Sequence, residues 1–502
     1  MANSRDALAI ASILILAVFT VLVASGTRTF ASGPISKFQS AFISTPESPS
    51  SVVYDSFDHF LYVSYGDGAS GGVAVVNGTT NLANVTLDSG PGPLLYDPSN
   101  HLVYAAGVNS QYLFEINGTA VVGRVATSHP TSLIYDPTDG LVYLATQGFP
   151  AIQVINQTKT VGGISADCSV ACNMLYDPSN GYLYVANTGD SSVSVIDGTS
   201  VISTLKAGAG PSGMTFDPSN NLVYVVNGNH GFGGNVTAIS GTEPVATIEV
   251  GTSPSGLFYD PGNGYIYVTD NQGISIIKGT TDISNVSLGF IPSAGAFDPG
   301  NGLLYYPNSA GYVVGVLNGT REIATVTVGP SPYAALFNPA NEYVYVSDNG
   351  FFGMCSGCVY QPSETVSVVD GCSAIENVTV GYDPTALYYD PALGSVYVDT
   401  VNGIYQISQP EITPNSSSNC STVEATSSTI APMSSSSMGL TSQRGTSRWT
   451  TTDSGTISTG RSSSPLAVSE MSFELVVVVV IFIGILLVLV WKPIQKKYPG
   501  RD

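Results

Sequence analysis

The chain has 502 residues, of which 10% are charged and 43% are hydrophobic, enough for several domains or one large repeat array. Between Lys37 and Glu411 only six basic residues stand against thirty acidic ones, a net charge of −24. Nucleic acid is excluded as a partner, because binding to phosphate needs clustered cations. The abundance of Gly, Pro and Tyr (54, 30 and 28 residues) favours strands and turns over helices.

The N-terminal segment, residues 1–32, is not expected to belong to the fold. An apolar run from Ala7 to Ala24 follows Arg5, and small residues come after it at Ser25 and Gly26. This pattern is typical of a secretory signal peptide. An uncleaved N-terminal anchor helix is the alternative, since 18 apolar residues can just cross a bilayer.

One phrase recurs through residues 33–411: an aromatic residue, Asp-Pro, a turn, and then an aromatic residue followed by Val-x-Asn. It is clearest in Tyr176–Asn187 (YDPSNGYLYVAN) and Phe216–Asn227 (FDPSNNLVYVVN). The first aromatic residues are spaced by 42, 39, 41, 40, 43, 38, 40 and 52 residues, which makes nine copies. They are Tyr54, Tyr96, Tyr135, Tyr176, Phe216, Tyr259, Phe297, Phe337 and Tyr389.

Each copy predicts four short antiparallel strands. After Tyr176, the Asp side chain and the fixed φ of Pro178 favour a tight turn, which Asn180-Gly181 closes into a hairpin. Two further turns separate a third and a fourth strand before Gly210-Pro211 leads into the next copy. Four strands per roughly 40 residues are typical of a β-propeller blade. A parallel β-helix is disfavoured, because its coils are shorter and have no such hairpin turn.

The phrases Tyr184–Asn187, Tyr224–Asn227 and Tyr267–Asp270 resemble the YVTN repeat of archaeal surface-layer propellers and related bacterial proteins. The resemblance covers residues 50–407 and implies an all-β fold, a single β-propeller of four-stranded blades. It implies little about activity, because the repeated residues are structural. Some copies depart from the pattern: Tyr54-Asp55-Ser56 lacks the Pro, and Phe337-Asn338-Pro339 replaces the Asp.

The blade count follows from the repeat. Eight copies are complete, and the ninth (Tyr389 to Ile407) lacks its last strand. The segment Lys37–Thr45 precedes the first copy, so we expect it to complete the last blade and close the ring, which removes two exposed sheet edges. Nine blades are therefore predicted, with seven or eight plus irregular flanks as the alternative.

Three segments follow the propeller. Residues 412–472 are dominated by Ser and Thr and are expected to form a disordered stalk, with or without O-glycans. Residues 473–491 form an apolar run that predicts a transmembrane helix. The basic tail, residues 492–502, is then cytoplasmic by the positive-inside rule, and the propeller lies outside the cell.

Six cysteines in an exported chain predict disulfide bonds. Cys168 and Cys172 are close enough in sequence to pair across a tight loop, and Cys355 and Cys358 lie in an insertion. A metal site at that CxxC is disfavoured, because neither a second CxxC nor a nearby His completes a tetrahedral set. One of the 15 connectivities pairs Cys372 with Cys420, which would tie the base of the stalk to the last blades.

Ten Asn-x-Ser/Thr sequons are candidate N-glycosylation sites, since a surface this poor in charge needs another source of solubility. The alternative is that Asn-Gly-Thr is only good turn chemistry. The sequons are at Asn77, Asn84, Asn117, Asn156, Asn235, Asn285, Asn318, Asn377, Asn415 and Asn419.

No catalytic residue, cofactor site or metal site is predicted. The four histidines, His59, His101, His129 and His230, form neither HExxH nor HxH, and no Walker A, GxSxG or dinucleotide motif occurs in a suitable context. Oxygen-rich turns could coordinate Ca²⁺, but turn chemistry is the favoured interpretation. Those turns contain Asp190, Asp270-Asn271 and Asp348-Asn349.

These features predict a membrane-anchored, extracellular, glycosylated propeller that is not an enzyme and serves in cell-surface binding, adhesion or envelope (surface-layer) assembly. Its expected partners are the lipid bilayer, through the C-terminal helix, and a protein or glycan at the cell surface. The first alternative is an extracellular lyase or hydrolase acting at the central channel. The second is a sensor that signals inward, for which the short tail leaves no room unless a membrane partner takes part.

Overall fold

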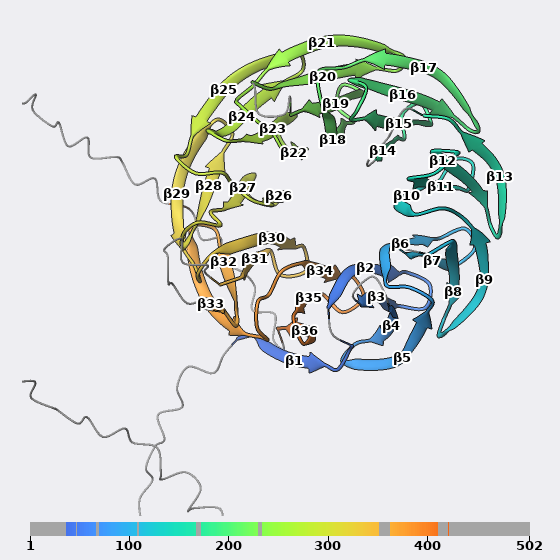
Figure 1. The fold of residues 1–502 in the computed structure, drawn as a ribbon. Coiled ribbons are helices and arrows are strands. Elements are labelled where there is room, and N and C mark those ends of the chain that lie inside the picture. The colour runs from blue at the N-terminus through green and yellow to red at the C-terminus, as the bar shows by residue number, and fades with distance from the viewer. Residues whose placement is uncertain are drawn as a thin grey trace, which may run out of the picture. The chain divides into compact units, whose positions relative to one another are not determined.

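We describe a computed structural model of the chain. It describes residues 37–409, except 47, 67–69, 108–109, 167–171, 229–232 and 351–361, together with residue 420. The described part contains nine four-stranded antiparallel sheets, which stand around a common centre as the blades of a propeller (Figure 1). The prediction of an all-β propeller with nine blades is confirmed.

Each blade starts with an inner strand beside the central channel and continues with a second strand. The inner strands are β2 (Pro49–Asp55), β6 (Pro91–Asp97), β10 (Pro130–Asp136), β14 (Cys172–Asp177), β18 (Pro211–Asp217), β22 (Gly256–Asp260), β26 (Ala296–Asp298), β30 (Pro332–Asn338) and β34 (Leu387–Asp390). The second strands are β3 (Phe60–Gly66), β7 (Leu102–Gly107), β11 (Leu141–Thr146), β15 (Tyr182–Asn187), β19 (Leu222–Asn227), β23 (Tyr265–Asp270), β27 (Leu303–Pro307), β31 (Tyr343–Asp348) and β35 (Ser395–Thr400).

A third strand and an outer strand complete each blade. The third strands are β4 (Gly71–Asn77), β8 (Tyr112–Asn117), β12 (Ile152–Asn156), β16 (Ser192–Asp197), β20 (Asn235–Ser240), β24 (Gly273–Lys278), β28 (Val313–Asn318), β32 (Thr365–Asp370) and β36 (Gly403–Ser408). The outer strands are β5 (Thr80–Leu87), β9 (Ala120–Ala126), β13 (Lys159–Ile164), β17 (Ser200–Lys206), β21 (Glu243–Glu249), β25 (Thr281–Ser287), β29 (Arg321–Thr327), β33 (Ser373–Thr379) and, in the last blade, β1 (Gln39–Ile43).

The blades are numbered 1 to 9 in chain order, from β2–β5 to the sheet of β34, β35, β36 and β1. Strand β1 pairs antiparallel with β36, from Gln39 opposite Ser408 to Ile43 opposite Ile404. The last blade is thus completed by the first strand of the chain, as predicted, so the ring has no open sheet edge at its closure.

Antiparallel pairing gives the ring two different faces. The turn face carries the hairpin turns after the inner strands and after the third strands. The connector face carries the turns after the second strands and the segments that lead from each outer strand to the next blade. On the turn face, the Asp that ends an inner strand accepts a backbone hydrogen bond from the residue two positions later, as Asp177 Oδ1 does from the N–H of Ser179 at 2.8 Å.

One position of this turn has a left-handed backbone in every blade. It is Gly181 in blade 4, with φ +77°. Blades 1 and 2 have His59 and His101 there, each with φ 60°, and blade 8 has Glu342. Each histidine has its Nδ1 within hydrogen-bond distance of the Tyr that precedes the turn, at 2.7 Å from the Tyr54 hydroxyl and 3.2 Å from the Tyr96 hydroxyl. These two histidines therefore have a structural role in the turn.

The second aromatic residue of the repeat packs between neighbouring blades, where its ring is at most 1% exposed in all nine copies. Its hydroxyl also links the blades: Tyr184 donates to the carbonyl of Gly241, in the last turn of the next blade, at 2.9 Å, and accepts from Asn180 Nδ2 at 3.1 Å. We call this arrangement the tyrosine latch. Latches to the next blade come from Tyr104, Tyr143, Tyr184, Tyr224, Tyr267 and Tyr397.

The latch of the last blade closes the circle. Tyr397 donates to the carbonyl of Gly78 in blade 1 at 3.0 Å, across 319 residues of sequence. The repeated Asn and Tyr, four residues apart, thus hold together both the turn and the interface between blades.

Candidate functional site

The wall of the central channel is uncharged. None of the nine inner strands contains Asp, Glu, Lys, Arg or His before the Asp or Asn with which it ends. These terminal residues are at most 2% exposed, and their Oδ1 atoms accept backbone hydrogen bonds of the adjacent turns in all blades. The inner strands therefore present uncharged side chains to a molecule in the channel: apolar groups, hydroxyl groups and the carboxamide of Asn173.

The remaining histidines do not assemble a site in the described residues. His129 is exposed in the connector between blades 2 and 3, and His230 lies outside the described residues. Within the described part of the chain, no group of three or more His, Cys, Asp or Glu side chains is placed to hold a metal ion.

Two of the predicted Ca²⁺ candidates lie in buried polar clusters near the connector face. Asp270 Oδ2 accepts from Ser275 Oγ at 2.9 Å. Asp348 Oδ2 accepts from Thr365 Oγ1 and Ser367 Oγ at 2.9 and 2.8 Å. These contacts join the second and third strands of one blade, which supports the interpretation as structural turn chemistry.

Three buried carboxyl groups have pKa values raised to near neutrality. Burial raises the pKa of Glu115, Asp348 and Asp399 to about 7 in each case. Glu115 is fully buried, and neither of its carboxyl oxygens has a hydrogen-bond partner among the described residues. Asp399 accepts one hydrogen bond, from the hydroxyl of Tyr388 at 3.1 Å. The sequence predicted Asp348 only as a residue of an oxygen-rich turn and gave no sign of Glu115 and Asp399, because the alternation of a strand does not reveal a carboxyl on its buried side.

A hollow with an uncharged lining lies on the connector face at blade 3. It has a volume of about 490 Å³ and lies between the end of β9 in blade 2 and the strands β12 and β13 of blade 3. We call it the niche. Its lining contains no charged residue and consists of Ala126, Thr127, Ser128, Thr146, Phe149, Pro150, Gln153, Thr160, Gly162 and Gly163.

Phe149 is 87% exposed, the largest exposure among the large hydrophobic side chains of the described residues. Beside it, Gln153 is only 8% exposed, and its Nε2 donates to the carbonyl of Ala126 at 2.9 Å and to the hydroxyl of Thr160. The Thr127 hydroxyl has no hydrogen-bond partner within the described chain. The niche therefore combines an open aromatic ring with a held carboxamide and several hydroxyl groups.

Glycine makes the room for this niche. Gly163 on the outer strand of blade 3 pairs with Gln153 on the third strand. A Cβ at Gly163 would stand 2.6 Å from Cγ of Pro150, so the proline ring occupies the space of a side chain. The Gly162-Gly163 pair and Phe149-Pro150 were visible in the sequence as departures from the repeat, which is the signal that could have found the niche.

Eight of the ten sequon asparagines lie in described residues. Asn77, Asn117, Asn156 and Asn318 end third strands and are exposed on the turn face. Three more are exposed on outer strands and one is half-buried at the start of β20: Asn84, Asn285, Asn377 and Asn235. Asn415 and Asn419 lie outside the described residues.

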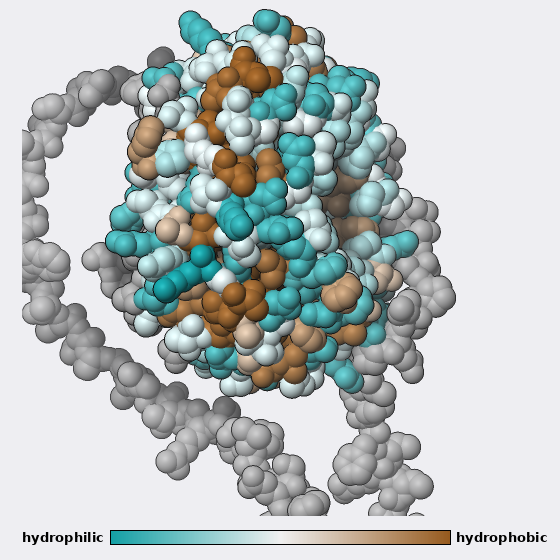
Figure 2. Space-filling view, turned by 90° about the vertical axis from the view of Figure 1, so that its right-hand side faces the viewer, coloured by the Kyte–Doolittle hydropathy of each residue, from teal (hydrophilic) through white to brown (hydrophobic). Residues whose placement is uncertain are grey.

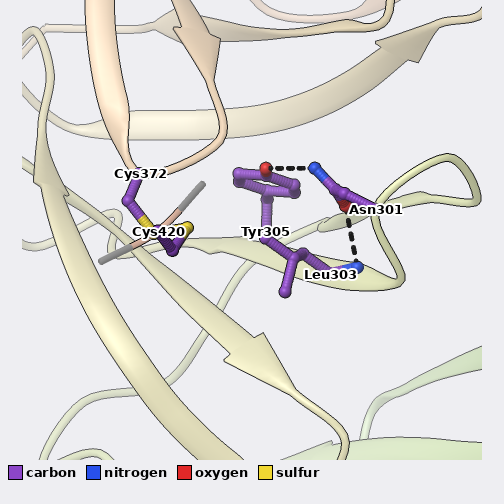
Figure 3. The surroundings of a disulfide bond; sticks show 5 residues. All are labelled: Asn301, Leu303, Tyr305, Cys372 and Cys420. Carbon is purple, nitrogen blue, oxygen red and sulfur yellow. Dashed lines mark hydrogen bonds between the residues drawn. A yellow bond between two sulfur atoms is a disulfide. The ribbon is translucent and has the colours of Figure 1, made fainter. Parts of the chain in front are cut away.

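The structure joins Cys372 and Cys420 in a disulfide, with Cα atoms 5.3 Å apart (Figure 3). The bond packs against the core between blades 7 and 8, beside Leu303 and Tyr305, on the turn face. It links Cys420, which follows the last strand in the sequence, to the last turn of blade 8. Cys168, Cys355 and Cys358 lie outside the described residues, and so do the predicted signal or anchor segment, stalk, transmembrane helix and tail. In the residues that the structure describes, no helix is long and apolar enough to cross a bilayer.

No protein-family model and no curated protein matches the chain, so the YVTN resemblance stays a prediction. Solved structures do match in fold. Dihydro-heme d1 dehydrogenase NirN has 13% identity and a TM-score of 0.47, covering 61% of this chain and 69% of that one. Virginiamycin B lyase from Staphylococcus aureus has 12% identity and a TM-score of 0.38, covering 74% and 98%. A streptogramin B lyase has 11% identity and a TM-score of 0.37, covering 74% and 97%.

This comparison corrects the prediction that the chain is not an enzyme. That prediction was drawn from the lack of familiar catalytic motifs, yet a dehydrogenase and lyases are among the propellers with a similar fold. A propeller can assemble a site from residues far apart in sequence, for which no local motif is needed. The similarity itself concerns the fold alone.

Proposed function

We propose that the chain is a cell-surface binding propeller that holds a neutral saccharide in the niche of blade 3. The observation that carries this proposal is the composition of the niche: an exposed Phe149 ring next to carboxamide and hydroxyl groups, with no charge in its lining. An exposed aromatic ring offers an apolar platform, and hydroxyl groups donate and accept hydrogen bonds. The Gln153 amide offers its oxygen as an acceptor, since its two N–H groups are donated to Ala126 and Thr160. A sugar ring presents the matching pair of surfaces, an apolar C–H face and a rim of hydroxyls.

The dimensions agree with this class of ligand. A hollow of about 490 Å³ falls within the usual range for small-molecule sites, roughly 300–1,000 Å³. The uncharged lining disfavours anionic ligands, because no cation is present to offset the desolvation of a carboxylate or phosphate. The carboxamide of Gln153 is fixed by its own hydrogen bonds, so little side-chain entropy is lost when a ligand binds to it.

The test is the binding of neutral oligosaccharides to the full chain, screened on an array and then measured by calorimetry. Phe149→Ala is expected to weaken the affinity at least tenfold, because it removes the stacking platform. Tyr312→Ala is the matched control, since it removes another aromatic side chain, 53% exposed, from the segment between β27 and β28 on the same face. Equal binding by the Phe149→Ala variant, or no binding of any neutral saccharide, would contradict the proposal.

The location at the cell surface and the glycans are part of the same proposal. Seven sequons are exposed in the described residues, which is a requirement for modification. Strand β1 starts and strand β36 ends on the turn face, and the Cys372–Cys420 bond lies there as well. A membrane anchor at residues 473–491 is part of this proposal. Protease treatment of intact cells checks the location, and mass spectrometry of the tryptic peptides checks the glycans.

An extracellular lyase or hydrolase is the second candidate. The observation in its favour is Asp348, whose pKa is raised by burial to about 7, a value suited to a group that exchanges protons near neutral pH. Asp348 is fully buried, so a substrate would have to reach it by opening the connector between blades 7 and 8. Incubation of the same saccharides with the chain, followed by mass spectrometry of the products, tests this candidate. Turnover that Asp348→Asn abolishes would favour it over simple binding.

A further inference from the structure

The outer rim carries an aliphatic side chain in the same place on eight blades, and it is exposed on seven of them. In each of these blades the pairing of the third strand with the outer strand shifts by one residue, so that the outer strand contains a β-bulge. The residue passed over by the pairing is Leu82, Val122, Val161, Ile202, Val245, Ile283, Ile323 or Ile375. We call these residues the rim belt.

Seven members of the rim belt are between 37% and 58% exposed. Figure 2 looks onto the side of the ring that carries β9, β13 and β17, and brown patches follow one another along this side. An apolar row that repeats from blade to blade is unusual for the surface of a solvated disc and marks an interaction surface. The charged residues of the outer strands indicate which part of the rim binds a partner.

Charges on neighbouring outer strands are segregated by sign. The basic arc consists of Lys159, at the turn-face end of β13, and Lys206, at the connector-face end of β17. The acidic strand is β21, with Glu243 at the turn-face end and Glu249 at the connector-face end. All four side chains are exposed, and none has an ion-pair partner in the described part of the chain.

The basic arc and the acidic strand each have one charge at the turn-face end and one at the connector-face end of an outer strand. When two propellers lie side by side with parallel axes, the turn-face ends of their outer strands meet, and so do the connector-face ends. Lys159 of one copy then faces Glu243 of the next, and Lys206 faces Glu249. Between these pairs, Val161 and Ile202 of the basic arc meet Val245 of the acidic strand. We propose that a second copy of this chain binds there, through a heterologous contact between the basic arc and the acidic strand.

The position of the two surfaces predicts how many copies assemble. Nine blades divide the circle into steps of about 40°. The middle of the basic arc lies between blades 3 and 4, which is one and a half steps, about 60°, from the acidic strand in blade 5. Three equal discs in one plane touch each other at points 60° apart, so this contact closes into a ring of three.

The outer strands and last turns of blades 4 and 5 contain no sequon, whereas the sequon residue Asn156 in the last turn of blade 3 pairs with Lys159 of the basic arc. The contact therefore requires that Asn156 carries no glycan. Each contact is small, and closure of the ring together with attachment to one surface supplies the effective concentration that a small contact needs. The contact and the ring of three require parallel axes, whereas saccharide binding in the niche does not depend on the orientation.

The test is the mass of the full-length chain in mild detergent, measured by light scattering over a range of concentrations. The wild type is expected to reach three times the mass of one chain at low salt and to dissociate at high salt, because exposed ion pairs are screened. Lys159→Glu/Lys206→Glu and Glu243→Lys/Glu249→Lys are each expected to remain monomeric. Lys278→Glu/Arg321→Glu changes the charge by the same amount elsewhere on the rim and is expected to leave the trimer intact.

Two combinations make the test specific. A chain with all four reversals regains a complementary pair of surfaces and should form the trimer again. An equimolar mixture of the two double variants should stop at heterodimers, because a ring of three cannot alternate two kinds of subunit. A wild type that stays monomeric, a fourfold variant that does not recover, or a mixture that forms no heterodimer would overturn the inference. Saccharide binding by the monomeric variants is measured separately, so failure of this contact is distinguishable from failure of the niche.

Discussion

Acidification from pH 8 to pH 5 is expected to stabilise this protein by several kcal/mol. Glu115, Asp348 and Asp399 are at most 2% exposed, and burial raises the pKa of each to about 7. In the unfolded chain the same groups titrate near pH 4. At pH 8 the folded protein therefore has to hold three ionised carboxylates away from water, with few or no hydrogen bonds to compensate, which opposes folding.

The sign follows from proton linkage. Between about pH 4 and pH 7 the folded state binds more protons at these three groups than the unfolded state, so stability falls as the pH rises. Below pH 4 both states are protonated, and above pH 7 both are ionised. A difference of roughly three pKa units corresponds to about 4 kcal/mol for one group. Burial also raises the pKa of Asp260 and Asp298, which adds to the effect in the same direction.

Urea unfolding at a series of pH values measures this effect. The variant Glu115→Gln/Asp348→Asn/Asp399→Asn replaces each group by a neutral side chain of similar shape, so it should be more stable than the wild type at pH 8. Its stability should depend less on pH, with the remaining slope due to the net negative charge of the whole propeller. Equal slopes for variant and wild type would show that these carboxyl groups are not held away from water.

Removal of one tyrosine latch is expected to destabilise the ring by more than the loss of an ordinary surface hydroxyl. Tyr184→Phe leaves the Gly241 carbonyl without the Tyr184 donor and removes one of the two acceptors of Asn180 Nδ2, at a cost of about 1–3 kcal/mol. Tyr184→Ala also leaves a cavity between blades 4 and 5, for which about 3–5 kcal/mol is expected. Tyr397→Phe should behave like Tyr184→Phe, because it opens the same contact at the closure of the ring.

Tyr182→Phe is the matched control, because this half-buried ring lies two residues earlier on β15 and takes no part in the latch. Its free energy of unfolding is expected to stay within about 0.5 kcal/mol of the wild type, as for most surface changes. If Tyr184→Phe and Tyr182→Phe had the same effect, the hydroxyl of the latch would contribute nothing to the contact between blades.

The repeated residues made most of the fold predictable. The spacing near 40 residues and the Asp-Pro turns define the blades, and the unpaired segment before Tyr54 implied the closing strand. The copies that depart from the repeat still form blades. Asn338 replaces Asp and still accepts the N–H of Ala340 at 2.9 Å, because an amide oxygen serves the turn as well as a carboxylate oxygen.

The sites were harder to foresee, because they depend on positions where one blade differs from its neighbours. Glu115 occupies a buried place that is Val75 in blade 1 and Val154 in blade 3, and nothing in its local sequence reveals the burial. The niche requires Phe149 and Gly163 together, from two segments that meet only in the folded blade. The rim belt depends on a bulge, which shifts the alternation of inward and outward side chains by one residue and so escapes a period-two pattern.

The central claim is a closed ring of nine blades in which residues 39–43 supply the last strand, and two N-terminal truncations test it most directly. A chain that starts at Lys37 keeps β1, whereas a chain that starts at Pro46 lacks it and exposes Ile404 and Ile407 of β36, both fully buried in the complete ring. Thermal unfolding of the two is the measurement. The first chain should melt like a version of the protein with its full N-terminus, and the second should melt at a much lower temperature or fail to fold. Equal melting temperatures for the two truncations would contradict the closed ring.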